Sequence, residues 1–100
     1  MCMGLRLWID DIREPPDDTW DVVTTSEAAI ALLTNFQREG MLWIPRDAVS
    51  FDHDLGGDDT TRPVVIWMIE NEFRFNNYYV HSANPVGIDW LNGMIERYLK

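Results

Sequence analysis

Short runs of hydrophobic residues divide the chain, and polar residues follow each run. The runs at 5–9, 48–51 and 77–80 predict three buried strands, and the valine pair at 22–23 predicts a shorter fourth strand. Residues 12–20 contain two prolines and an aspartate pair, which predict a loop. The sheet is therefore expected to have three or four strands.

Three stretches have apolar residues at helical spacing. Thr24 and Glu27 stand at the spacing of a capping box and predict the start of a helix. Asn84, which precedes a proline, predicts the N-cap of the last helix. Residues 64–73 fit a buried helix capped by Thr61, although their first three residues also fit a strand. The predicted core faces of the first and last helices consist of Ala29, Leu32, Leu33, Phe36, Trp90, Leu91, Met94, Ile95 and Tyr98.

Strands that alternate with helices predict an α/β domain with a mostly parallel sheet and helices on both faces. The 100 residues allow one domain, spanning 1–100, with an irregular connector at 41–47. A hydrophobic content of 46% and an aromatic content of 12% exclude a disordered chain. The loop at 12–20, where this class usually has a helix, is an irregularity.

Composition also limits the partners and the compartment. Seventeen acidic residues against eight basic ones give a net charge of −9, which excludes general binding to DNA or to anionic membranes. The single Cys2 excludes an internal disulfide and favours a reducing compartment. The start of the chain does not resemble a signal peptide, and the longest apolar run, 64–69, is far shorter than the ~20 residues of a membrane helix. We expect a cytoplasmic protein, and the composition leaves its oligomeric state open.

Polar residues gather after three of the predicted strands. In open parallel sheets, ligands bind beyond the carboxyl ends of the strands, so these residues are expected to share one cleft. Crowded carboxylates raise one another's pKa unless a cation neutralises them, and oxygen ligands suit Mg²⁺ or Mn²⁺. Histidines there are candidates for acid and base catalysis. The residues at the three strand ends are Asp10 and Asp11; Asp52, His53 and Asp54; and His81, Ser82 and Asn84.

Several of these side chains have two interpretations. Strand alternation places Asp52 and Asp54 on one side of the sheet and His53 on the other. Arg13 is either a phosphate clamp or a surface residue. The helix start at Asn84 is first a cap, and its N–H groups also suit an anion. The tryptophans at 20 and 43 either belong to the core or line a base-binding cleft.

Three motifs together resemble the cyclic-phosphate-processing receiver-like domain family over residues 5–99. They are Asp-Asp-Ile-Arg-x-Pro at 10–15, Phe-Asp-His-Asp-Leu-Gly at 51–56 and His-Ser-Ala-Asn-Pro-x-Gly at 81–87. The resemblance implies a small Rossmann-like fold, similar to receivers and flavodoxins. It implies a three-layer sandwich with about four strands and three helices.

The resemblance also implies residue roles. Asp10 and Asp11 match the acidic pair that holds Mg²⁺ in receivers, and Asp52 matches their acceptor aspartate. The chain departs from receivers because it is shorter and has His81, rather than a lysine, at the end of its last strand.

We hypothesise a metal-assisted phosphodiesterase that acts on a cyclic phosphate of a nucleotide or an RNA end. Alternatives are a module that sequesters a cyclic nucleotide without turnover, and a degenerate receiver used in protein interaction. In the enzyme hypothesis the metal ligands are Asp10, Asp11 and Asp52; the acid and base come from His81, His53 and Asp54, the last being either a ligand or a base; and the substrate contacts are Arg13, Ser82 and Asn84.

Overall fold

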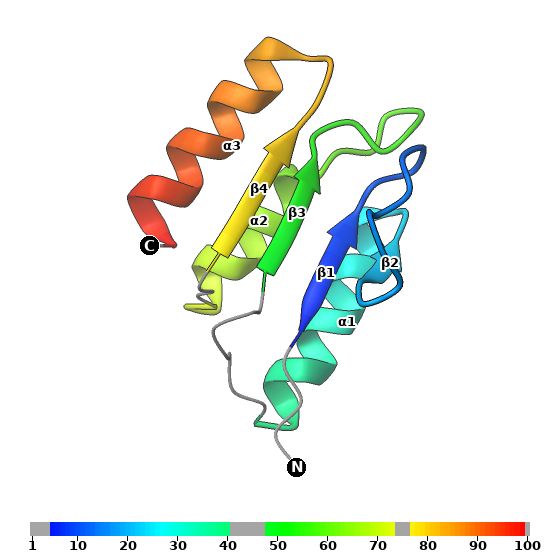
Figure 1. Cartoon of the computed structure of the whole chain (residues 1–100). Helices are drawn as coiled ribbons and strands as arrows, with labels where there is room; N and C mark the ends of the chain where they lie inside the picture. Colours follow the sequence, from blue (N-terminus) through cyan, green and yellow to red (C-terminus); the bar gives the residue numbers. More distant parts are fainter. Residues whose placement is uncertain (1–4, 41–47, 74–76, 100) are drawn as a thin grey trace.

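The computed structural model describes residues 5–40, 48–73 and 77–99 of the chain (Figure 1). Cys2, Trp43 and the predicted connector at 41–47 lie outside these residues. The elements, in chain order, are β1 (Arg6–Ile9), β2 (Asp21–Val23), α1 (Ser26–Arg38), β3 (Ala48–Asp52), α2 (Arg62–Glu70), β4 (Asn77–His81) and α3 (Pro85–Tyr98).

The four strands form one parallel sheet in the order β2-β1-β3-β4. With three helices, this is the predicted small α/β fold of the receiver and flavodoxin type. The prediction that β4 is a buried strand is wrong, because β4 lies at the edge of the sheet. Its residues Asn77 and Tyr79 are exposed, while Tyr78 and Val80 face the core.

The described helices all pack on one face of the sheet, so the prediction of helices on both faces is wrong. In Figure 1, α1 and α2 lie behind the strands and α3 runs along β4. Tyr78, which points to the same face as the buried Val49, donates a hydrogen bond to Glu96 of α3. For α1 and α2, the reason is the chain path. The connections through α1 and α2 both advance toward β4, and right-handed crossovers in one direction place their helices on one face. The β1–β2 connection, which runs the other way, is the loop at 10–20.

Side chains from all four strands and from the three described helices form the core on that face. Burial of such side chains contributes about 1.5–3 kcal/mol each relative to exposure. Tyr98, predicted to belong to the core, is 45% exposed, and Leu99 is buried instead. No helix in the described part of the chain has the length and apolar character needed to cross a membrane. The fully buried core residues include Leu7, Ile9, Ala29, Leu33, Val49, Phe51, Val64, Val65, Met68, Leu91 and Ile95.

The structure shows which of the predicted residues cap the helices. Thr25, not Thr24, caps α1, because its Oγ1 accepts a hydrogen bond from the Ala28 N–H at 3.1 Å. The 64–73 stretch is helical as predicted but begins at 62 and ends at 70, and the Thr61 side chain makes no cap hydrogen bond. Asn84 caps α3 as predicted.

Candidate active site

The carboxyl ends of β1, β3 and β4 bring the predicted acidic residues together. Asp52 and His81 are register partners on neighbouring strands. One carboxylate oxygen from each of Asp10, Asp11 and Asp52 lies within 4.8 Å of the other two. The structure therefore brings these four residues together at one edge of the sheet.

Asp10 is the buried member of the cluster, with 1% of its surface exposed. Its Oδ1 accepts hydrogen bonds from the backbone N–H groups of Ile12 and Arg13, at 2.9 and 3.0 Å. Burial alone raises the pKa of Asp10, but these two bonds and His81 outweigh it, so the pKa is lowered. Asp10 is therefore a fixed negative charge whose own loop, residues 10–13, wraps around it.

Neighbouring groups stabilise the carboxylates of Asp52 and Asp11 less well than that of Asp10. Burial raises the pKa of Asp52, and the neighbouring Asp10 charge raises it further, while His81 and Arg13 offset part of the effect. Asp11 Oδ1 is buried without a hydrogen-bond partner among the described residues. Gly56, with φ +90°, lies so close that a Cβ there would be 3.0 Å from Asp11 Oδ2. A divalent cation fits this donor set, because it would satisfy the unpaired oxygen and neutralise the crowded charges.

His81 connects the cluster to the open face of the sheet, which is the face opposite the described helices. Its Nε2 lies 3.0 Å from Asp10 Oδ2, and its Nδ1 lies 3.3 Å from Ser50 Oγ. Because the ionised Asp10 accepts, Nε2 carries a hydrogen and Nδ1 accepts from the Ser50 hydroxyl. The ring lies 5.0 Å from the Trp8 ring, and 22% of the side chain is exposed. His81 is thus held in place and still reachable by a ligand.

His53 lies on the helix side of the sheet and is 4% exposed. Arg62 Nε donates to His53 Nε2 at 2.8 Å, which leaves the hydrogen on Nδ1. That Nδ1 donates to Asp54 Oδ1 at 3.0 Å. A Cβ on Gly87 of α3 would lie 2.4 Å from the His53 ring, so the glycine provides the room for it. Both ring nitrogens are used, and His53 orients Asp54 rather than joining the carboxylate cluster.

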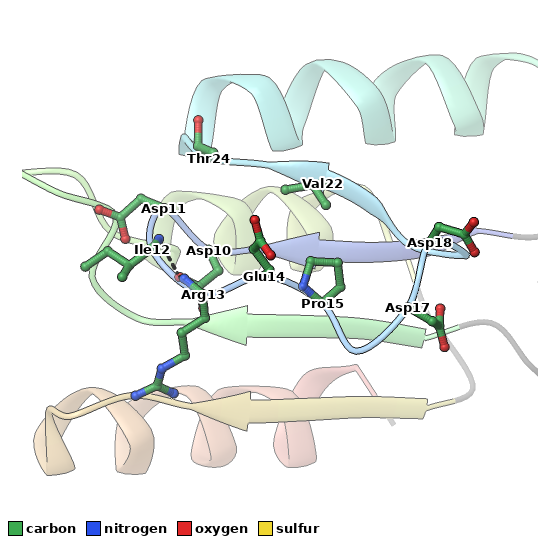
Figure 2. A pocket seen from close by; sticks show the side chains of 10 residues that line it. All are labelled: Asp10, Asp11, Ile12, Arg13, Glu14, Pro15, Asp17, Asp18, Val22 and Thr24. Atoms are coloured by element: carbon green, nitrogen blue, oxygen red, sulfur yellow. Dashed lines mark hydrogen bonds between the residues drawn. The ribbon is translucent and has the colours of Figure 1, made fainter.

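A small cavity of about 240 Å³ lies beside Asp52 and Asp54 and includes Arg13 and Ser82 in its wall. Figure 2 shows the Arg13 side chain extending from the acidic loop toward the end of β4. Ser82 Oγ accepts from the Asn84 N–H at 3.0 Å and keeps its own hydrogen for a ligand. One face of the acidic cluster therefore meets a cationic side chain and a hydroxyl.

The start of α3 does not offer free N–H groups to an anion, contrary to the expectation. Asn84 Oδ1 accepts from the Val86 and Gly87 N–H groups, at 3.1 and 3.2 Å. The Ile88 N–H bonds to the Asn84 carbonyl, and Pro85 has no N–H. What Asn84 presents is its amide nitrogen, 3.5 Å from Asp54 Oδ2.

A second cavity, of about 480 Å³, lies between the 10–18 loop and β2 and is drawn in Figure 2. Asp10, Asp11 and Arg13 belong to its wall, together with the exposed Glu14 and Asp18. The sequence marked the carboxylates, the histidines and the substrate-contact candidates of this site, but it missed Ser50 and Arg62, which hold the two histidines. Ser50 and Arg62 have no motif of their own. The register that pairs β3 with β4 is the signal that places Ser50 near His81.

The family profile described as the cyclic-phosphate processing receiver domain matches residues 5–97. This range contains every strand-end residue of the site. No curated protein matches the chain, and no solved structure matches it. The sequence profile, the parallel four-stranded sheet and the acidic edge agree, and the chain belongs to the cyclic-phosphate processing receiver domain family.

Proposed function

We propose that this receiver-type domain is a metal-assisted phosphodiesterase that hydrolyses a cyclic phosphate of a nucleotide or an RNA end. The observation that carries the proposal is the meeting of Asp10, Asp11 and Asp52, with ligand oxygens within 4.8 Å. Arg13 lines the adjoining cavity. A carboxylate cluster beside a lone guanidinium suits an anionic substrate that arrives with, or at, a divalent cation.

Asp10, Asp11 and Asp52 would hold Mg²⁺ or Mn²⁺. The ion would supply charge neutralisation at the phosphoryl oxygens of the substrate. The backbone N–H bonds to Asp10 hold one oxygen of the set in place. A bound cation would stabilise two groups most. They are the carboxylate of Asp52, whose pKa is raised, and the Asp11 oxygen that has no hydrogen-bond partner among the described residues.

The remaining polar groups bind the phosphate and move protons. Arg13 and the Ser82 hydroxyl would contact its oxygens in the 240 Å³ cavity. Asp54, oriented by His53, is suited to accept a proton from the attacking water as its oxygen bonds to phosphorus. His81, as an imidazolium, would donate its Nδ1 proton to the ester oxygen that leaves as the ring opens, while its Nε2 keeps the hydrogen bond to Asp10. The product is an acyclic phosphate monoester, or a diester opened at one end.

The test is phosphorus NMR of cyclic mononucleotides, cyclic dinucleotides and nucleoside 2′,3′-cyclic phosphates, each with Mg²⁺ and with Mn²⁺. The enzyme proposal predicts a ring-opened product from at least one substrate. It also predicts that His81→Gln lowers turnover roughly 10²–10⁴-fold, the usual contribution of a positioned acid or base. As a control, Asp89→Asn changes an exposed acid of α3 that lines none of the three cavities described for this protein.

Two outcomes contradict the enzyme proposal. Saturable binding without any product would indicate a sequestering module. An absence of both binding and product across the panel would leave the acidic edge without a cyclic-phosphate role.

A further inference from the structure

The open face of the sheet carries an aromatic cavity of about 480 Å³ that the proposed chemistry does not use. Trp8 on β1, Tyr79 on β4 and Trp20 from the loop before β2 line it. The Trp8 and Trp20 rings meet edge to face at 5.3 Å, and the Trp20 and Tyr79 rings meet edge to face at 6.3 Å. We refer to this site as the indole cavity.

The indole cavity adjoins the carboxylate cluster. His81 lines the cavity, and the same imidazole is hydrogen-bonded to Asp10. Trp8 makes a second connection, because its Nε1 donates to the Arg13 carbonyl at 3.0 Å. A ligand in the cavity therefore lies next to the cluster and to the loop that carries Arg13.

The chemistry of the cavity selects flat heterocycles. Tyr79, a large aromatic residue on the edge strand β4, is 55% exposed. Its ring therefore remains available for stacking. The Arg6 guanidinium lies 4.3 Å above the Trp20 ring, and Glu14 at the rim adds an acceptor. Arg6 Nε and Trp20 Nε1 have no hydrogen-bond acceptor among the described residues. Stacking surfaces with a few donors and one acceptor are what a nucleobase requires.

We propose that the indole cavity binds the base of the substrate while its cyclic phosphate lies at the carboxylate cluster. This inference rests on the proposed function, and it assigns the nucleobase of that substrate to a binding site of its own. A volume of about 480 Å³ exceeds that of one base, and it lies in the usual range of small-molecule pockets, roughly 300–1,000 Å³. Purines and pyrimidines are both expected to fit.

The first measurement uses adenosine and uridine, which have no phosphate, and follows the indole N–H signals by NMR. The Trp8 and Trp20 signals are expected to shift with added nucleoside. Trp67 and Trp90 are internal controls, because Trp67 packs against Phe73 and Trp90 lies under Arg62 on the helix side. Unchanged Trp8 and Trp20 signals, or equal shifts at all four indoles, would overturn the proposal.

The second measurement compares the affinities for adenosine 2′,3′-cyclic phosphate and ribose 2′,3′-cyclic phosphate. The base is expected to tighten binding about 5- to 140-fold, the range for one stacked base. Tyr79→Ala should reduce that ratio, and Tyr98→Ala, which removes an exposed tyrosine at the far end of α3, should preserve it. A ratio near one in the wild type, or an unchanged ratio in Tyr79→Ala, would overturn the base site.

The two proposals fail separately. Nucleoside shifts at Trp8 and Trp20, without binding or turnover of any cyclic phosphate, would support the base site and contradict the proposed function. Turnover of ribose 2′,3′-cyclic phosphate as efficient as that of the nucleotide would support the phosphodiesterase and contradict the base site.

Discussion

Gly87 offers a direct test of how α3 and His53 are fitted together. A Cβ at this position would lie 2.4 Å from His53 Cγ, 2.7 Å from Nδ1 and 2.8 Å from Cβ. Side chains do not approach that closely, so Gly87→Ala must displace the imidazole or move α3 away from it. The imidazole is anchored at both nitrogens, by Arg62 and by Asp54, so its displacement breaks two hydrogen bonds.

The expected cost follows from these contacts. Overpacking of a buried site costs about 1–3 kcal/mol, and each lost hydrogen bond about 0.5–1.5 kcal/mol. Replacing glycine by alanine in a helix returns about 1 kcal/mol. Gly87→Ala is therefore expected to lower the free energy of unfolding by about 1–5 kcal/mol.

Gly93 is the matched control, because it lies in the same helix and a Cβ there would meet nothing within 4 Å. Gly93→Ala should gain only the helical preference, about 0.5–1 kcal/mol. The melting temperatures of the two variants should then differ by about 6–50 °C, at about 4–8 °C for each kcal/mol in a domain of this size. Thermal unfolding followed by circular dichroism measures both. Equal melting temperatures for the two variants would refute the packing of His53 against α3.

Two further predictions concern single carboxylates. Asp59 accepts hydrogen bonds from the Ser26 N–H and hydroxyl at 2.8 and 2.6 Å; burial raises its pKa, but these bonds outweigh that effect and lower it. Asp59→Asn should therefore lower the free energy of unfolding by about 1–2 kcal/mol at neutral pH. This loss should disappear as the pH falls through the lowered pKa, below 3.8. Urea titrations that compare it with Asp58→Asn test this, and an equal effect of the two substitutions would contradict it. For Asp52 the pKa is raised, so the stability linked to its proton is present below pH 3.8 and lost as the pH rises through the folded pKa. Asp52→Asn should then stabilise the metal-free protein at neutral pH by about 0.5–2 kcal/mol, and a loss of stability in chelator would show that the charge is well accommodated.

The sequence predicted the sheet well where apolar runs are short and end in acids, as at 5–9 and 48–51. It predicted β4 wrongly as a buried strand, because Tyr78, Tyr79 and Val80 are all apolar in character. Only the strand order shows that β4 is at the edge and that Tyr79 faces outward. The sequence also does not predict that the described helices pack on one face of the sheet. That placement depends on the direction of each crossover and not on any local pattern.

The first helix shows how a distant residue decides a local boundary. Thr24 and Thr25 are both good N-cap residues, and Glu27 suits a capping box with the first of them. The helix begins one residue later, with Thr25 as its cap and Asp59 bonded to Ser26. No local pattern in the sequence marks Asp59, because the bond that gives it a role joins residues 33 positions apart.

The site was predictable as a set of carboxylates, because the ends of parallel strands meet at one edge. The surroundings of those carboxylates were not predictable. Strand alternation placed His53 on the side opposite Asp52, but Arg62, which decides where its proton lies, comes from the start of α2. Asn84 was read both as a cap and as the start of an anion site. The two readings compete, because the cap uses the same N–H groups that an anion would need.

The metal dependence of turnover tests the central claim most directly. Ring opening is followed by phosphorus NMR. It should be undetectable in chelator, where circular dichroism checks that the protein is still folded. The rate should then rise to saturation as Mn²⁺ is added. Asp11→Asn neutralises the proposed ligand with the unpaired oxygen and should raise the half-saturating Mn²⁺ concentration by about 10- to 100-fold or more. Asp89→Asn, which changes an exposed acid of α3 outside the described cavities, should leave it unchanged. Equal rates in chelator and in Mn²⁺, or the same half-saturation for both variants, would contradict the account.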